Sequence, residues 1–421
     1  MTVAHLSRAK TAARVIERCR QIAACTEVPG ETTRLFLSPP VRRVHALLTE
    51  WMQAASMSVR IDAAGNLRGL LPGPTAHAPR LVLGSHLDTV PNAGAFDGIL
   101  GVVLGIAVAE EVRGQSLPFS IEVIGFSEEE GVRFSTPFLG SLAVIGKLDA
   151  ETLARADRNG VTIAEAIRIF GLNLSELPNA ALAAGSFAYL ELHIEQGPLL
   201  ESEGLPLGIV EAIAGQTRMT FVFEGRANHA GTTPMHLRRD ALAAAAQWIT
   251  EVEAYANEHT GLVATVGKIE AQPGAGNVVA ARVTASLDVR HPNDDARTAA
   301  VRALVSAAEL AAAKRGVKLA TQTHLEQPAV PMDPHLTRLL ESAAKKAQTP
   351  ARRMPSGAGH DAMIVAQRLP AAMLFLRSPG GISHHPDETV LPNDVEAALN
   401  TAIEFLSLLR DDTTIPRDDH A

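Results

Sequence analysis

The feature that most constrains the fold of this chain occurs four times: a short apolar run that ends abruptly in histidine or carboxylate side chains. The four runs, each with the polar group that follows it, are 80–85 with His86, 120–126 with Glu128–Glu130, 188–192 with His193, and 372–376 with His384 and His385. Continuous apolar runs of this length are typical of buried strands. Because the active sites of open α/β sheets form at the carboxyl ends of the strands, the pattern predicts an α/β domain with one polar site at that edge.

The pattern changes between residues 211 and 328. Strands are predicted at 219–224, 262–269 and 283–290, and helices at 240–257 and 298–315. This mixture is typical of a compact α+β domain. Because the α/β pattern resumes near Pro334, we expect two domains. A discontinuous catalytic domain with a mixed, largely parallel sheet is predicted at 1–210 plus 329–421, and an inserted α+β domain at 211–328.

The composition narrows the class of partner. The chain has 421 residues, a formal net charge of -8 and an aromatic content of 4%. With no basic face and few aromatic side chains, we expect no nucleic-acid partner. No apolar run reaches the roughly 20 residues that a membrane span needs, and the first residues do not resemble a secretory signal. The only two cysteines, Cys19 and Cys25, fit a reducing compartment, so a cytoplasmic location is predicted.

Two acidic residues near the first strand have ordinary alternatives to a metal site. A metal-bound histidine needs an acceptor on its second ring nitrogen, and Asp88 lies two residues after His86, on the same face of an extended chain. A surface histidine near a turn would show the same spacing. Asp97 precedes a predicted helix, where it could cap the helix or bridge two metal ions.

The strongest local signal is the run Glu128–Glu130, which follows a buried strand directly. Adjacent carboxylates repel one another unless a cation lies nearby. Hydrolases that use metal ions need one carboxylate as a ligand and a neighbouring one as general base. Taken singly, His193 could be a core histidine. Together with His86 and His384, these residues form a ligand set suited to zinc, manganese or a similar divalent ion.

Motifs of other enzyme classes are missing from the sequence. It contains no Gly-x-Ser-x-Gly elbow, no phosphate-binding loop and no His-Glu-x-x-His. Residues 357–362 mimic a dinucleotide-binding fingerprint. No apolar strand is predicted before them, so we reject a dinucleotide site.

Eight segments carry a family resemblance. Four of them resemble the aminoacylase/carboxypeptidase superfamily of metallohydrolases: 84–90, 96–98, 129–134 and 193–197. Four more are similar to its branch of N-carbamoyl-L-amino-acid hydrolases, β-ureidopropionases and allantoate amidohydrolases: 225–235, 286–290, 357–362 and 381–384. The resemblance spans about 14–409.

The resemblance implies a centre that holds two divalent metal ions per subunit, zinc or manganese, with cobalt and nickel as the other options. One ion would bind His86, Asp97 and His193. The second would bind Asp97, Glu130 and His384, so that Asp97 bridges the two.

The resemblance also implies roles for neighbouring residues. Glu129 would be the general base, because the family's acidic pair directly precedes a glycine, here Gly131. Asp88 would orient His86. The implied substrate contacts are Gln196, His229, Asn277, Arg290, Gly357 and His360.

Two of these contacts suggest how substrate is held. Arg290 suits a bidentate grip on a carboxylate. His229 would reach from the inserted domain of a partner subunit and polarise a carbonyl, which implies a homodimer joined through a dimerisation and lid domain.

Two positions depart from the family pattern. Ala93 stands where a glycine is usual, and Leu142 stands where the family often has arginine. The second departure bears on the edge of the substrate pocket.

The expected reaction is hydrolysis of a ureido C–N bond beside a carboxylate, with release of ammonia and carbon dioxide. An N-carbamoyl-L-amino acid and allantoate both carry these groups, so either could be the substrate. The alternatives are an aminoacylase or dipeptidase within the superfamily and a relative without catalysis. The presence of Glu129 argues against the second.

Overall fold

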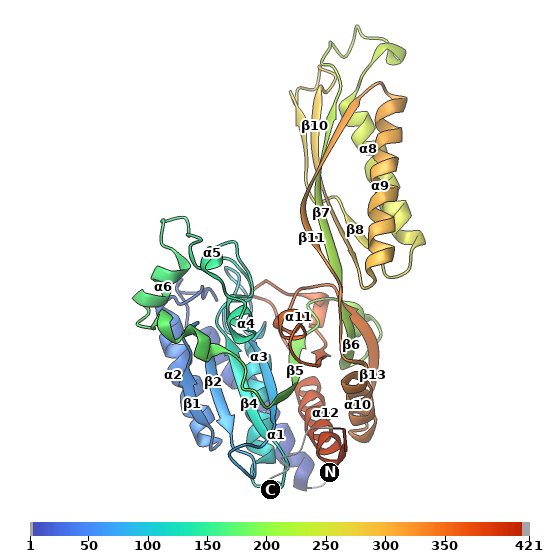
Figure 1. Cartoon of the computed structure of the whole chain (residues 1–421). Helices are drawn as coiled ribbons and strands as arrows, with labels where there is room; N and C mark the ends of the chain where they lie inside the picture. The colour runs from blue at the N-terminus through green and yellow to red at the C-terminus, as the bar shows by residue number, and fades with distance from the viewer. Residues whose placement is uncertain (1–2, 415–421) are drawn as a thin grey trace. The chain divides into compact units, whose positions relative to one another are not determined.

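The computed structural model describes residues 3–414, and the chain forms two compact units (Figure 1). The larger comprises Met1–Glu211, Met332–Met354 and Gly359–Ala421, and the smaller Ala212–Pro331 with Pro355–Ala358. The short return segment 355–358 therefore differs from the predicted division, which placed it in the catalytic domain. Its backbone explains this: Ala214 N donates to Ser356 O, and Arg290 Nη1 donates to Gly357 O.

The larger unit contains most of a nine-stranded sheet in the order β1-β2-β4-β3-β5-β14-β6-β12, with β13 paired to β6. Its strands are β1 (Ser58–Ile61), β2 (Leu67–Leu71), β3 (Arg80–His86), β4 (Ser120–Phe126), β5 (Ser186–Ile194), β6 (Leu207–Ile213), β12 (Val330–Pro331), β13 (Ala351–Ser356) and β14 (Ala371–Leu376). Strand β12 and the last residues of β6 and β13 belong to the smaller unit. The central strands β4, β3, β5 and β14 are parallel. The pairs β1–β2, β2–β4, β14–β6 and β12–β6 are antiparallel. The predicted α/β class with a mixed sheet is confirmed.

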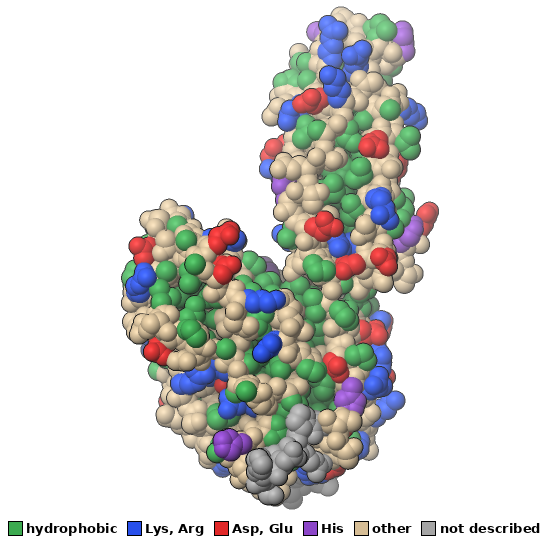
Figure 2. All heavy atoms as spheres, viewed as in Figure 1, with side chains coloured by type: hydrophobic (Ala, Val, Ile, Leu, Met, Phe, Trp, Pro, Cys, Tyr) green, Lys and Arg blue, Asp and Glu red, His purple; other side chains and the backbone are tan. Residues whose placement is uncertain are grey.

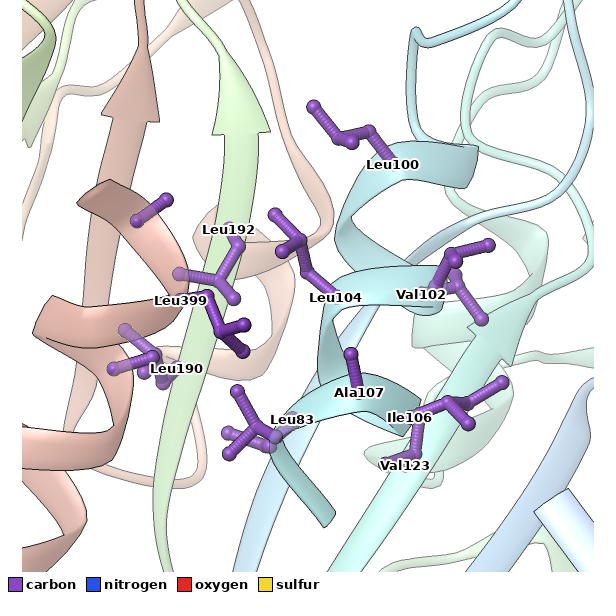
Figure 3. Close-up of a cluster of buried hydrophobic side chains, with 14 of the residues drawn as sticks. Leu83, Leu100, Val102, Leu104, Ile106, Ala107, Val123, Leu190, Leu192 and Leu399 are labelled. Carbon is purple, nitrogen blue, oxygen red and sulfur yellow. The ribbon is translucent and has the colours of Figure 1, made fainter. Parts of the chain in front are cut away.

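Helices pack around this sheet. They are α1 (Val3–Ala23), α2 (Pro39–Ala54), α3 (Ile99–Val112), α4 (Leu139–Val144), α5 (Ala150–Leu153), α6 (Ile163–Ile169), η1 (Leu174–Ala180), α7 (Leu199–Ser202), α10 (Pro334–Lys346), α11 (Asp361–Val365), η3 (Pro379–Gly381) and α12 (Pro392–Asp411). Among these, α3 is apolar around almost its whole circumference. It packs against β3, β4, β5 and α12, and Figure 3 shows Leu104 of α3 beside Leu192 of β5 and Leu399 of α12.

Helix α3 approaches β5 so closely that its backbone touches the strand. A Cβ atom added at Gly101 would lie 2.1 Å from the backbone oxygen of Leu192. The segment that carries Asp97 leads directly into this helix. The tight packing of α3 against β5 therefore fixes the position of Asp97 relative to the end of β5.

The smaller unit is a five-stranded antiparallel sheet packed on two helices. It contains β7 (Gly215–Glu224), η2 (Met235–Leu237), α8 (Ala241–Glu258), β8 (Val263–Thr265), β9 (Ile269–Gln272), β10 (Arg282–His291), α9 (Asp294–Lys314) and β11 (Lys318–Gln327). The order is β11-β7-β10-β8, with β9 also on β10. Its core is separate from that of the larger unit and centres on Trp248, Phe221 and Phe223.

The structure corrects several local predictions. The hairpin at 57–71 is confirmed as β1 and β2. The predicted strand 262–269 is instead two short strands, because Lys268 N donates to the side chain of Ser286 and interrupts the ladder along β10. A strand, β13, precedes 357–362, but it is polar and only partly buried, in keeping with the prediction that no apolar strand stands there.

The structure also bears on the predictions about membrane spans, surface charge and cysteines. Within residues 3–414, none of the helices has both the length and the apolar character that a membrane span requires. On the face shown in Figure 2, Lys and Arg are interspersed with Asp and Glu over the larger unit. Cys19 and Cys25 are buried free thiols.

We predict that Gly101→Ala lowers the free energy of unfolding by about 1–3 kcal/mol, because the added methyl group must push α3 away from β5. Denaturant unfolding measured by circular dichroism tests this. Gly185→Ala is the matched control in the same unit, since its Cβ would meet only an ordinary contact at 3.8 Å from Pro79 Cα. Equal unfolding free energies for the two variants would contradict the proposed close packing.

Candidate metal centre

The parallel centre of the large sheet brings the predicted ligands to one edge. His86 is the last residue of β3, His193 lies at the end of β5, and Glu130 follows β4. His384 follows η3, in the loop after β14. Since β4, β3, β5 and β14 are neighbours, these residues converge although they are far apart in the sequence.

The first group of ligand atoms consists of His86, Asp97 and His193, which are all buried. His193 Nε2 lies 3.4 Å from Asp97 Oδ1, and His86 Nε2 lies 3.9 Å from the same oxygen. The two Nε2 atoms lie 3.4 Å apart. The three atoms therefore surround one point from three directions.

The opposite ring nitrogens show which tautomers are present. His86 Nδ1 lies 3.1 Å from the backbone oxygen of Asp88, and His193 Nδ1 lies 2.9 Å from the backbone oxygen of Ile194. A carbonyl oxygen only accepts, so each Nδ1 carries a proton, and in a neutral ring Nε2 is then the atom with a lone pair for a cation. Two lone pairs and a carboxylate oxygen that face one another fit a divalent cation and repel without one.

Asp88 differs from its predicted role in one respect. The closer contact to His86 Nδ1 comes from its backbone oxygen, and its carboxylate Oδ1 lies 3.5 Å away. The carboxylate instead accepts hydrogen bonds from the backbone N–H groups of Glu129 and Glu130, at 2.9 and 3.0 Å. Because Asp88 lies beyond the end of β3, strand alternation no longer sets its direction. It joins the end of β3 to the acidic loop after β4.

The second group consists of Asp97, Glu130 and His384. His384 Nε2 lies 3.2 Å from Asp97 Oδ2 and 3.5 Å from Glu130 Oε1. Asp97 thus directs Oδ1 to one group and Oδ2 to the other. The alternative role of Asp97 as helix N-cap is wrong, since Gly98 holds that position and no side chain caps α3.

Gln196 also lies at this centre. Its Nε2 donates to both carboxylate oxygens of Asp97, at 3.1 Å each, and lies 3.3 Å from His384 Nε2. Gln196 was predicted to contact substrate, and the structure places its amide among the ligand atoms. A donor that faces both oxygens of Asp97 again marks a position suited to positive charge.

The acidic groups are held in an environment that opposes ionisation. Burial and the neighbouring charge of Asp97 raise the pKa of Glu130 to about 7. Burial raises the pKa of Glu129 well above its usual range, and Glu130 and Asp361 raise it further, against the opposing effect of His86. Burial lowers the pKa of His193 to about 4, which keeps its ring neutral. Nearby positive charge would reverse the shifts of the carboxylates.

Sequence analysis missed a layer of buried groups below the centre. Glu191 accepts hydrogen bonds from Ser85 Oγ, Tyr189 Oη and Ala362 N. Glu191, His193 and His360 also offer ligand atoms within 4.8 Å of one another. A carboxylate in the middle of an apolar strand was the available signal for Glu191.

Two further buried residues support the loops. The guanidinium of Arg34 donates to the backbone oxygens of Leu87, Ile22 and Cys25. Glu388 accepts from the backbone N–H of Asp97. Neither residue belongs to a motif or a periodic pattern, so only the structure identifies them.

The remaining predicted residues lie in the smaller unit. His229 is exposed, and its backbone forms a bridge with Val278 beside Asn277. The guanidinium of Arg290 donates two hydrogen bonds to the carboxylate of Asp288, from Nε and Nη2, both within 3.0 Å. Its Nη1 donates to the backbone oxygen of Gly357. The bidentate partner seen for Arg290 is therefore Asp288, which leaves fewer N–H groups for a substrate carboxylate than predicted.

Comparison with known proteins identifies the family of this chain. The sequence profile described as peptidase family M20/M25/M40 matches residues 82–408. The chain is 38% identical to allantoate deiminase 2 of Glycine max over 428 residues, covering 94% of this chain and 89% of the relative. It is 40% identical to an N-carbamoyl-L-amino acid amidohydrolase of Geobacillus stearothermophilus over 379 residues, covering 89% and 93%.

A solved structure shows the same similarity in three dimensions. A hydantoinase/carbamoylase family amidase from Burkholderia ambifaria superimposes with a TM-score of 0.89 at 36% sequence identity, covering 95% of this chain and 98% of that chain. The fold and the sequence therefore point to the same group of hydrolases that act on amide C–N bonds.

We predict that Glu130→Gln stabilises the metal-free protein at pH 8 by about 1–3 kcal/mol. The pKa of Glu130 is about 7 in the folded chain against a usual 4.5, so its contribution to stability is present at low pH and is lost as the pH rises from 4.5 through 7. The gain should therefore shrink toward pH 4.5. Chemical unfolding in the presence of a chelator measures both values.

Addition of Mn²⁺ or Zn²⁺ should reverse the order at pH 8, because the native chain gains more from a bound cation than the variant does. Glu50→Gln, at an exposed position of α2, is the control and should change the unfolding free energy by less than about 0.5 kcal/mol. A metal-free Glu130→Gln protein that is less stable than the native chain at pH 8 would refute this account.

Proposed function

The chain belongs to peptidase family M20/M25/M40, and from this membership and its site we propose that it hydrolyses the ureido C–N bond of a small carboxylate substrate with two divalent ions. The observation that carries the proposal is the division of Asp97 between two ligand groups. Oδ1 faces His193 and Oδ2 faces His384, with Glu129 and Glu130 beside them. This arrangement suits a dinuclear centre next to a general base.

The two ions would be held by His86, Asp97 and His193 and by Asp97, Glu130 and His384. When bound, they would supply Lewis acidity to a carbonyl oxygen and lower the pKa of water. Zinc and manganese both fit nitrogen and oxygen ligands.

The chain's own residues would carry the proton. Glu129 accepts a proton from the attacking water as the new C–O bond forms at the ureido carbon. It then donates this proton to the departing nitrogen as the C–N bond breaks, and ammonia leaves. Glu129 directly precedes the ligand Glu130 and offers a carboxylate oxygen in one group with Glu130 and His86, which places it beside the proposed ions.

The substrate is proposed to be allantoate or an N-carbamoyl-L-amino acid, as the names of the relatives suggest. Both compounds carry a ureido group and a carboxylate. We assign Gln196 and His360 of the larger unit to substrate contact, together with Asn277, Arg290 and Gly357 of the smaller unit. Arg290 would use the N–H groups that Asp288 and Gly357 leave free.

The quaternary structure and the cell compartment stay proposals as well. We propose a homodimer in which the smaller unit serves as dimerisation and lid domain, and in which His229 of one subunit stabilises the transition state in the partner's site. A cytoplasmic location fits the two buried free thiols, Cys19 and Cys25.

We predict ammonia release when the purified protein, supplied with Mn²⁺ or Zn²⁺, is given allantoate or a panel of N-carbamoyl-L-amino acids. Release should stop with a chelator and return with added metal. Glu129→Gln should lower kcat by about 10²–10⁴-fold with an unchanged circular dichroism spectrum. Ammonia-free cleavage of N-acyl amino acids or dipeptides would favour the aminoacylase or peptidase alternative.

We predict that mixing two inactive variants restores activity if His229 acts in the partner's site. In a heterodimer of Glu129→Gln and His229→Ala subunits, one site has both native residues and the other has neither. Random exchange should therefore recover about one quarter of native activity. Mixtures that stay inactive after confirmed subunit exchange would place His229 in its own subunit's site.

A further inference from the structure

Glu388 connects two loops of the larger unit that are distant in sequence. Its side chain is buried, and Oε1 accepts hydrogen bonds from the backbone N–H groups of Phe96 and Asp97, at 3.0 Å each. Oε2 accepts a hydrogen bond from Ser383 Oγ at 3.1 Å. One carboxylate thus engages the loop that delivers Asp97 and the residue next to His384.

The loop before Asp97 is shaped around this side chain. A Cβ atom at Gly94 would lie 2.3 Å from Glu388 Cβ and 2.5 Å from its Oε1, so only glycine fits there. The contacts therefore occupy both carboxylate oxygens and the stem of Glu388. They leave little room for the two loops to shift independently.

Neither ligand on these loops is fixed by a strand. Asp97 lies between β3 and α3, and His384 follows η3 with a positive φ of 55°. A non-glycine residue in that region of φ needs support from its surroundings. Glu388 supplies this support at Ser383, while it also binds the backbone N–H of Asp97.

We propose that Glu388 is a positioning residue that holds Asp97 and His384 at the separation needed to share one cation. This rests on the proposed metal centre, because the predicted effect is on the binding of a cation. Glu388 makes no contact with the ligand atoms themselves. Its effect passes through the backbone of residue 97 and the side chain of Ser383.

The test separates hydrogen bonding from charge and from general stability. Glu388→Ala removes every hydrogen bond. Glu388→Gln keeps an oxygen for Phe96 N and Asp97 N, and its amide can donate to Ser383, whose hydroxyl also accepts. Asp333→Ala is the matched control, because Asp333 Oδ1 also accepts two backbone N–H groups, of His335 and Leu336, at the start of α10.

Mn²⁺ and Zn²⁺ are titrated into metal-free protein against a coloured chelator, and the melting temperature of each metal-free protein is recorded. We expect Glu388→Ala to weaken the binding of one equivalent of cation by about 10–100-fold. Glu388→Gln should stay within about threefold of native affinity. Asp333→Ala should lower the melting temperature and leave both affinities unchanged.

Native affinity for both equivalents in Glu388→Ala would overturn the inference. So would equal losses in Glu388→Gln and Glu388→Ala, since charge rather than hydrogen bonding would then be at work. If Glu388→Ala does not fold, Glu388→Asp decides, because its shorter side chain retracts the carboxylate and should weaken the same equivalent. Absence of cation binding by the native chain would overturn the proposed function itself, which distinguishes the two failures.

Discussion

The structure depends on one electrostatic constraint: lone pairs and carboxylates point at common positions on the edge of a buried sheet. The Nε2 atoms of His86 and His193 lie 3.4 Å apart beside Asp97 Oδ1, and a second group of ligand atoms lies around Asp97 Oδ2. In a low-dielectric interior such an arrangement is unfavourable unless positive charge is present. The ligand atoms at this edge of the sheet therefore repel one another in the folded chain, and a bound divalent cation would remove this repulsion. Burial, and after it the neighbouring carboxylates, raise the pKa values of Glu129 and Glu130.

Backbone groups impose this unfavourable arrangement. The carbonyl oxygen of Asp88, after β3, and that of Ile194, the last residue of β5, fix the ring nitrogens of the two histidines. The carboxylate of Asp88 accepts hydrogen bonds from two N–H groups of the acidic loop. Glu388 does the same for the loop that carries Asp97. Helix α3 then locks that loop against β5, where Gly101 allows contact with the strand. The hydrophobic core in Figure 3 therefore supports the site directly, because a shift of α3 would move Asp97.

The sequence predicted those features of the fold and the site that follow a repeated pattern of apolar and polar residues. Apolar strands that end in histidine or glutamate indicated both the parallel sheet and the edge where its polar residues meet. Hydrogen bonds that involve backbone atoms were beyond reach. For that reason the backbone contact from Asp88 to His86 and the position of Glu388 emerged only from the structure. The pairing of Arg290 with Asp288 joins two side chains, and no motif or periodic pattern indicated it. Strand β11 was missed for another reason: most of its side chains are exposed, so it carries no periodic apolar signal.

The two ligand groups differ in how they are built, and this difference has chemical consequences. His86 and His193 are buried and lie at the ends of regular strands, so their positions follow from the sheet. His384 has about half of its side chain exposed and a left-handed backbone, and Gln196, which contacts the same Asp97 oxygens, is left-handed as well. Strained non-glycine residues of this kind concentrate at sites where structure must be held ready for a ligand. The group with His384 is therefore the one that is more accessible to solvent. The group with His193 is buried on regular strands, and the sheet fixes its position relative to Asp97.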